Sequence, residues 1–340
     1  MQARAIRFGS AKRRSKMLAA AAIPVVLALV LAGCSSAGGR PQPNAGGTGG
    51  QVVTTPRITI ALISHSAPGD TFWDIVRRGA EEAAAKDNIN LLYTAQPEGA
   101  GQAQLVQQAI GQKVAGIAVT LAKPDAMKTV LVNAKAQNIP VIAINAGQSA
   151  SKELGAKLFI GADDRIAGEA VGQKLLDEGF KQPICVIHEQ GNAGLEDRCA
   201  GVKAKVPGTE ILYVQGSDMT QASSTNTSKL QATTSADVVI GLGAPFTLTA
   251  LKAVEATGSK AKIASFDLNP DLAQQIKDGK IAFTVDQQPW LQGYLAVDYF
   301  WQQLRGGFEI GGGQPVLTGP AIVDKNNVDS ILKFAKDGIR

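Results

Sequence analysis

Residues 114–145 read VAGIAVTLAKPDAMKTVLVNAKAQNIPVIAIN, and this stretch decides the fold class. Two short apolar runs, Val114–Thr120 and Val141–Asn145, flank the segment Asp125–Gln137, in which apolar residues recur at helical spacing. Near-continuous apolar runs are typical of strands buried on both faces, and parallel strands need a helical crossover between them. The stretch therefore predicts a strand–helix–strand unit of a parallel sheet.

The same alternation of strand-like and helix-like segments recurs from Arg57 onward. Further helices are expected at 72–86, 165–178, 246–257 and 290–304. The remaining expected strands are Ile58–Ser64, Ile89–Thr94, Leu158–Gly161, Ile184–His188, Ile211–Val214, Val238–Leu242, Ile263–Asp267 and Ile281–Asp286. So many strands in a chain of 340 residues predict an α/β protein with two Rossmann-like, doubly wound lobes.

A break in the pattern divides the two lobes. Residues 146–157 lack helical periodicity, so we place the boundary near Gly161. We expect the last helix, after Pro289, and the stretch Gly306–Gly313 to return to the first lobe. The first lobe would then hold residues 57–160 and about 288–318, and the second lobe residues 161–287 and about 319–340.

The positive charge of the chain belongs to its N-terminal segment. The chain has 34 Lys and Arg residues against 29 Asp and Glu residues, a net charge of +5. Six of the basic residues and none of the acidic ones lie in residues 1–33, which leaves 28 basic against 29 acidic residues in the remainder. A body with a net charge of −1 gives no electrostatic reason to expect nucleic acid as a partner.

The N-terminal segment has the layout of an export signal. A basic stretch precedes the apolar run Met17–Gly33, which ends in Leu31-Ala32-Gly33-Cys34, a pattern typical of a lipoprotein processing site. We expect residues 1–33 to be a signal peptide and Cys34 to carry lipid, such as palmitate. An uncleaved anchor helix is the alternative. Residues 34–56, rich in Gly, Ser, Pro and Asn, are expected to be a flexible linker that tethers the body outside the cytoplasm.

Two further cysteines could pair with each other. Cys185 lies in an expected strand and Cys199 in the helix that follows it, and a strand packs against its own crossover helix. An even number of cysteines in an oxidising compartment favours a disulfide, with two buried thiols as the alternative. The spacing fits no usual zinc pattern, so no metal is expected.

Polar and aromatic side chains follow the strands at their carboxyl ends, where open parallel sheets bind ligands. They are His65, the loop Asp70-Thr71-Phe72-Trp73, Thr120, Asn145, His188-Glu189-Gln190, Asp267 and Gln287, with Arg198 close to the same edge. Planar amide, carboxylate and guanidinium groups bridge neighbouring hydroxyls, and an aromatic ring packs on the C–H face of a sugar. This inventory suits a neutral, polyhydroxylated ligand.

Each of these candidates also has a structural alternative. Phe72 and Trp73 could be core residues at the start of a helix, and Asp267 could cap the helix that follows it. Arg198 could be a solvated helix residue, and the two histidines of the chain could make structural hydrogen bonds.

Several motifs then occur in a specific order along the chain. They are Asp70-Thr71-Phe72-Trp73, Asn138-Ile139-Pro140-Val141-Ile142, Gly161-Ala162-Asp163, Arg198 with Gly201, Phe266-Asp267 with Asp278-Gly279-Lys280, and Gln287 with Pro289. Through them the body, from Arg57 to roughly Val323, resembles the periplasmic sugar-binding proteins of the ribose/galactose type, the solute receptors of ABC importers. The resemblance implies two lobes joined by three crossovers, the type I arrangement, closing on the ligand like a hinge.

The resemblance also implies a set of binding residues. Family positions fall on Asp70, Phe72, Trp73, Asn145, Arg198, Asp267 and Gln287. Weaker candidates, apart from these family positions, are His65, Thr120, Glu189 and Asp218. Three positions depart from the ribose receptor. Asn145-Ala146 replaces Asp-Arg, and Gly243 replaces Asn. The aromatic residue in the second lobe of that receptor falls near Asp218, where this chain has no aromatic residue. We therefore expect another pentose or hexose, a sugar alcohol or a related polar small molecule.

These features favour a monomeric, lipid-anchored receptor that delivers a sugar or polyol to an ABC permease. A sensor that signals through a membrane kinase or chemoreceptor is the alternative, because it would use the same binding module. An enzyme is not expected: Gly241-Leu242-Gly243 begins a dinucleotide fingerprint, but Phe246 stands at its third glycine. No cofactor is expected either.

Overall fold

The computed structural model describes residues 55–340. The expected signal peptide, the lipidated Cys34 and nearly all of the expected linker lie outside these residues. Within the described part of the chain, no helix has both the length and the apolar character that a bilayer crossing requires.

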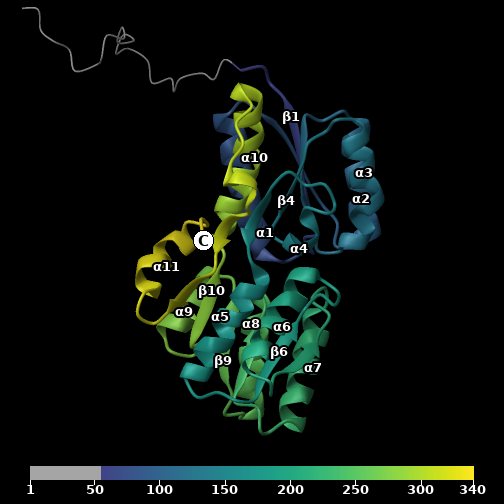
Figure 1. The fold of residues 1–340 in the computed structure, drawn as a ribbon. Helices are drawn as coiled ribbons and strands as arrows, with labels where there is room; N and C mark the ends of the chain where they lie inside the picture. Colours follow the sequence, from purple (N-terminus) through teal and green to yellow (C-terminus); the bar gives the residue numbers. More distant parts are fainter. Residues whose placement is uncertain (1–54) are drawn as a thin grey trace, which may run out of the picture. The chain divides into compact units, whose positions relative to one another are not determined.

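The first lobe is a six-stranded parallel sheet covered by helices on both faces (Figure 1). Its strands, in the order β11-β5-β4-β3-β1-β2, are β1 (Thr59–Ser64), β2 (Asn90–Ala95), β3 (Gly116–Thr120), β4 (Val141–Ile144), β5 (Phe159–Ala162) and β11 (Val316–Gly319). Helices α1 (Thr71–Lys86) and α10 (Pro289–Gly306) pack on one face, and α2 (Gly99–Gly111) and α3 (Pro124–Ala136) on the other. The short α4 (Gln148–Ser151) follows β4, in a stretch where no helix was expected.

The second lobe repeats this architecture with one antiparallel edge strand. Its strands, in the order β12-β10-β9-β8-β6-β7, are β6 (Pro183–Ile187), β7 (Glu210–Tyr213), β8 (Val238–Gly241), β9 (Lys262–Phe266), β10 (Phe283–Asp286) and β12 (Ala321–Asp324), which is antiparallel to β10. Helices α5 (Asp164–Asp177) and α6 (Ala193–Lys205) cover one face. The other face is covered by α7 (Met219–Ala232), α8 (Ala244–Thr257), α9 (Pro270–Lys277) and α11 (Val328–Lys336). Two doubly wound α/β lobes are thus confirmed.

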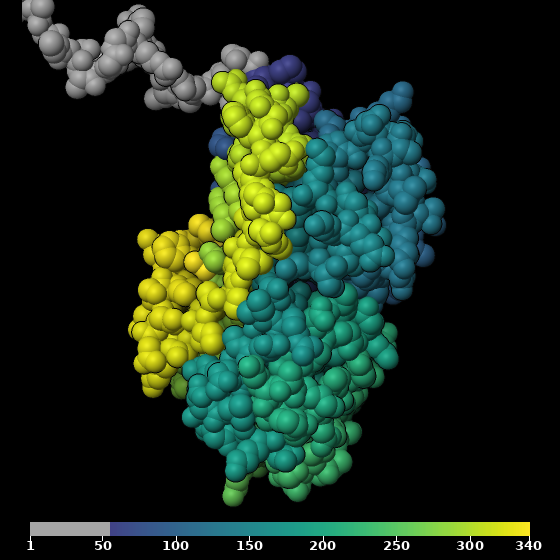
Figure 2. All heavy atoms as spheres, viewed as in Figure 1, coloured from purple at the N-terminus to yellow at the C-terminus, as the bar shows by residue number. Residues whose placement is uncertain are grey.

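The chain passes between the two sheets three times. It leaves the first sheet after β5, so the expected boundary at residue 161 falls inside this strand, which pairs with β4 and β11. It returns between β10 and α10, and it crosses again between β11 and β12. Figure 2 shows the C-terminal segments, in yellow, lying against atoms of both lobes.

The crossing segments are tied together by hydrogen bonds. The side-chain amide of Gln288 donates to the Thr318 carbonyl oxygen at 2.7 Å, and the Thr318 hydroxyl donates to the Gln287 carbonyl oxygen at 2.7 Å. Because these residues lie on two of the three crossings, the bonds hold the crossings side by side. The lobes are therefore joined by a compact hinge.

A disulfide joins Cys185 on β6 to Cys199 on α6, as the sequence analysis anticipated. The two Cα atoms lie 5.8 Å apart, and both residues are fully buried in the apolar core between β6 and α6. The cross-link closes a loop with a sequence separation of 14 residues.

We expect the double variant Cys185→Ala/Cys199→Ala to fold but to lose about 2–3 kcal/mol of unfolding free energy, because a short closed loop restricts the unfolded chain. Urea denaturation of the oxidised wild type and the variant measures the difference. Reducing agent should lower the midpoint of the wild type and leave that of the variant unchanged. Equal midpoints for the oxidised wild type and the variant would contradict a stabilising role for the bridge.

Candidate functional site

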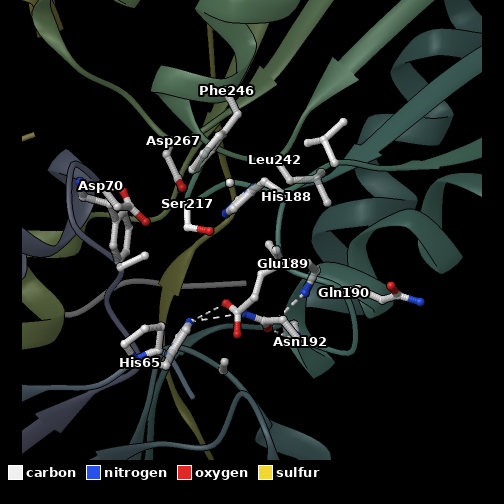
Figure 3. A pocket seen from close by; sticks show the side chains of 18 of the residues that line it. His65, Asp70, His188, Glu189, Gln190, Asn192, Ser217, Leu242, Phe246 and Asp267 are labelled. Atoms are coloured by element: carbon white, nitrogen blue, oxygen red, sulfur yellow. Dashed lines mark hydrogen bonds and ion pairs between the residues drawn. The ribbon is translucent and has the colours of Figure 1, made fainter. Parts of the chain in front are cut away.

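The carboxyl ends of the strands of both lobes face a cavity of about 510 Å³ (Figure 3). Nine of the residues expected to bind ligand line this cavity: His65, Asp70, Phe72, Trp73, Asn145, Glu189, Arg198, Asp267 and Gln287. The doubly wound topology explains the convergence, because each strand delivers its last residue to the same edge. Two candidates, Thr120 and Asp218, do not line it.

The aromatic wall of the first lobe comes from the start of α1. The carboxylate of Asp70 accepts a hydrogen bond from the Phe72 N–H at 3.1 Å and thereby caps the helix. This start directs Phe72 and Trp73 inward, and their rings meet edge to face at 5.2 Å. Both side chains are 5% exposed and pack with Val76, yet both also line the cavity, so they serve the core and the site together.

Arg198 is a buried residue and not a solvated one. Its Nε donates to a carboxylate oxygen of Asp164 at 2.7 Å, and its guanidinium lies 4.8 Å from the centre of the Phe266 ring. A second nitrogen donates to the Leu242 carbonyl oxygen at 3.3 Å. These contacts hold the positive charge at the edge of the cavity. The sequence did not identify Asp164, because its pairing with Arg198 arises only from the packing of α5 on α6.

A chain of amide groups links the two lobes behind the cavity. The Asn145 amide donates to Oε1 of Gln292 at 3.2 Å, the Gln292 amide donates to the Gln287 carbonyl oxygen at 3.0 Å, and the Gln287 amide donates to Oδ1 of Asp267 at 2.6 Å. Asn269, and not Asp267, caps α9, so the alternative reading of Asp267 as a cap is wrong. The carboxylate of Asp267 is instead directed to the cavity.

Asn145 and Asp267 hold equivalent positions in the two lobes. Each directly follows a strand, β4 or β9, and each has a left-handed backbone, with φ of 66° and 64°. This conformation is costly for residues other than glycine, although Asn and Asp tolerate it better than most, and such residues cluster at functional sites. Both lobes therefore use the same turn to present a polar side chain to the cavity.

Direct hydrogen bonds between the lobes place the protein in a closed conformation. Nδ1 of His65 lies 2.8 Å from the Thr120 hydroxyl, and Nε2 lies 3.1 Å from the Asn192 amide of the second lobe. The same amide donates to Glu189 at 2.8 Å, and Lys123 of the first lobe donates to the Gln190 carbonyl oxygen at 2.7 Å. Both nitrogens of His65 are thus satisfied by protein groups, and Thr120 acts by orienting this ring.

Asp218 serves a different purpose from the one expected. Its carboxylate accepts hydrogen bonds from the N–H groups of Thr220 and Gln221 at 3.0 and 2.9 Å, and so caps α7 on the exposed surface. The aromatic groups of the second-lobe wall are instead His188, Phe246 and Tyr213. Asn192 and Phe246 were not singled out as ligand candidates, because nothing in the local sequence distinguishes them from a helix cap and a core residue.

Asp70 and Asp267 place two acidic groups in the cavity, one from each lobe. Burial and the charge of Asp267 raise the pKa of Asp70 to about 7. Burial also raises the pKa of Asp267 to about 6, although Arg198 and the Gln287 amide act in the opposite direction. Close to neutral pH, such carboxyl groups both accept hydrogen bonds and, in their protonated form, donate them.

The raised pKa of Asp70 predicts how the stability of the ligand-free protein depends on pH. The folded carboxyl group binds its proton more tightly than the unfolded one, whose pKa is near 3.8. Its contribution to stability is therefore fully present below roughly pH 4 and is lost as the pH rises through about 7. Between pH 4.5 and 8, the thermal unfolding temperature of the wild type should fall more steeply than that of Asp70→Asn. Asp271→Asn is the control, because Asp271 is exposed, and its pH dependence should match that of the wild type. If the unfolding temperatures of the wild type and Asp70→Asn change in parallel with pH, the raised pKa of Asp70 is contradicted.

Comparison with known proteins agrees with this geometry. Residues 60–307 match the model of the periplasmic binding protein domain. The xylose/arabinose-binding protein XylF of Sulfolobus acidocaldarius is 26% identical over 282 residues, covering 77% of this chain and 70% of that protein. The ribose import binding protein RbsB of Bacillus subtilis is 25% identical over 248 residues, covering 71% and 80%.

Two solved structures extend the comparison. A carbohydrate transporter from Acidothermus cellulolyticus in complex with myo-inositol is 46% identical, with a TM-score of 0.83, and the match covers 84% of this chain and 100% of that one. A solute-binding protein of an ABC transporter from Burkholderia graminis in complex with D-arabinose is 26% identical, with a TM-score of 0.72 and coverage of 80% and 97%. The resemblance inferred from the ordered motifs is confirmed, and the chain belongs to the periplasmic binding protein family.

Proposed function

We propose that this protein is an extracytoplasmic receptor that captures a cyclic polyol or sugar between its two lobes and delivers it to an ABC importer. The observation that carries the proposal is the composition of the cavity between the strand ends. There, carboxyl, amide and guanidinium groups from both lobes surround a space walled by the rings of Phe72 and Trp73.

The chemistry of these groups matches the hydroxyls of such a ligand. Each hydroxyl donates one hydrogen bond and accepts up to two, and Asp70, Asp267, Asn145 and Arg198 supply acceptors and donors on opposite sides of the cavity. The apolar face of the ligand ring would pack on Trp73. The 46% identical relative holds myo-inositol, which supports a cyclic polyol as the ligand class.

Binding between the lobes couples ligand capture to closure. His65 and Lys123 of the first lobe already contact Asn192 and the Gln190 carbonyl oxygen of the second lobe in the closed form. A ligand that contacts Asn145 and Asp267 at once has more contacts in this form than in an open one, so it shifts the equilibrium toward closure. The closed receptor then presents both lobes together to the permease.

The proposal is tested by isothermal titration calorimetry with myo-inositol, other cyclitols, pentoses, hexoses and alditols. We expect one or more of these ligands to bind the wild type. Asp267→Ala should weaken that binding at least about tenfold, because it leaves buried ligand hydroxyls without a partner.

Asp271→Ala is the matched control, because Asp271 is exposed on the neighbouring helix, and its affinity should equal that of the wild type. Two results would count against the proposal. The first is the absence of binding for the whole panel. The second is an unchanged affinity in Asp267→Ala.

We also propose that Cys34 anchors the receptor to the membrane through a lipid. The support is the sequence Leu31-Ala32-Gly33-Cys34 after an apolar run and a basic stretch. The wild type should incorporate labelled palmitate and sediment with membranes, whereas Cys34→Ser should take up no label. Membrane association that persists in Cys34→Ser would favour an uncleaved helical anchor instead.

A further inference from the structure

A stacked pair of rings forms the second-lobe wall of the cavity. His188 directly follows β6, and Phe246 lies in the first turn of α8. Their ring centres are 3.7 Å apart, with an angle of only 12° between the planes, and both residues line the cavity. Figure 3 shows the pair near Asp267 and Ser217, with His65 on the far side of the view.

Two glycines make room for this pair. A Cβ atom at Gly243 would come within 3.0 Å of the Phe246 ring and 3.4 Å of the His188 ring. A Cβ atom at Gly216 would come within 2.8 Å of the His188 carbonyl oxygen and 3.0 Å of the Phe246 ring. The loops after β7 and β8 are thus shaped around the stacked rings, which makes the pair a built feature of the wall.

The two histidines of the chain differ in their hydrogen bonding. Both ring nitrogens of His65 have protein partners. Nδ1 of His188 is buried and has no hydrogen-bond partner among the described residues. A buried polar atom is normally paired, and the ring that carries this one lines the cavity, so the site offers a ligand hydroxyl as a partner for the ring.

The surroundings of His188 also determine the protonation state of its ring. Burial and the nearby charge of Arg198 lower its pKa to about 3, so the imidazole is neutral at physiological pH. A neutral imidazole offers one N–H donor and one nitrogen acceptor, which is the hydrogen-bonding capacity that a hydroxyl group complements. A neutral hydroxyl group can therefore satisfy the hydrogen bonds of this ring, and no charged group on the ligand is needed.

We infer that His188, held flat against Phe246, is a ligand-binding residue that hydrogen-bonds one hydroxyl of a neutral cyclic polyol and sets which isomer fits. The inference rests on the proposed function and adds to it a ligand-binding residue of the second lobe beside Arg198 and Asp267. Phe246 is a positioning residue, because its stacked ring fixes the plane of the imidazole.

The test compares the wild type with His188→Phe and His188→Gln by calorimetry, using myo-inositol or whichever panel ligand the wild type binds, and the monodeoxy analogues of that ligand. His188→Phe keeps a flat ring and loses the polar atoms, and we expect affinity to fall about tenfold. His188→Gln keeps a donor and an acceptor and should recover part of that loss.

The deoxy analogues identify the hydrogen bond directly. One analogue should bind the wild type about tenfold more weakly than the parent ligand, and His188→Phe should no longer distinguish this analogue from the parent. Phe246→Leu should weaken binding in the wild type but add little further loss in the His188→Phe background. Thermal unfolding of each ligand-free variant verifies its fold.

The outcomes separate this inference from the function on which it rests. If the wild type binds a panel ligand but His188→Phe keeps the same affinity and the same preferences among analogues, the inference is overturned and the proposed function stands. Additive losses for Phe246→Leu and His188→Phe would remove the positioning role of Phe246. If the wild type binds no polyol or sugar, both the proposed function and the inference fail.

Discussion

The site depends on one constraint: polar groups that leave water at the strand ends must find hydrogen-bond partners. The amides of Asn145, Gln292 and Gln287 meet this constraint by bonding one another and Asp267 across the hinge. Arg198 meets it through Asp164 and a backbone carbonyl. The same network that satisfies these groups also orients them at the cavity in the closed conformation.

The hinge follows from the connectivity of the two sheets. Three passages of the chain between the lobes lie side by side, and Thr318, Gln287 and Gln288 bind them into one unit. The disulfide between β6 and α6 stiffens the second lobe away from the hinge. Two separate lobes joined by a compact hinge have the geometry in which closure is a rigid-body motion of one lobe on the other.

The two lobes contribute different chemistry to the cavity. The first lobe supplies Phe72 and Trp73 as an apolar surface, with Asp70 at its edge. The second lobe supplies Arg198 and Asp267 together with the neutral ring of His188. A ligand with an apolar ring face and a polar rim of hydroxyls, as proposed here, is complementary to this division.

Residue periodicity was sufficient to predict two doubly wound lobes, because buried strands and their crossover helices follow local rules of burial and spacing. The ends of those strands then located Asp70, Asn145, Asp267 and Gln287, since topology sends every strand end to one edge. Tertiary packing alone decided the partners: Arg198 pairs with Asp164, His65 with Asn192, and His188 with Phe246. It also left Asp218 on the surface, where this residue caps α7. The paired residues lie 34 to 127 positions apart, and the exposure of Asp218 depends on which face of a helix is solvated. Neither is encoded in the spacing of a single segment.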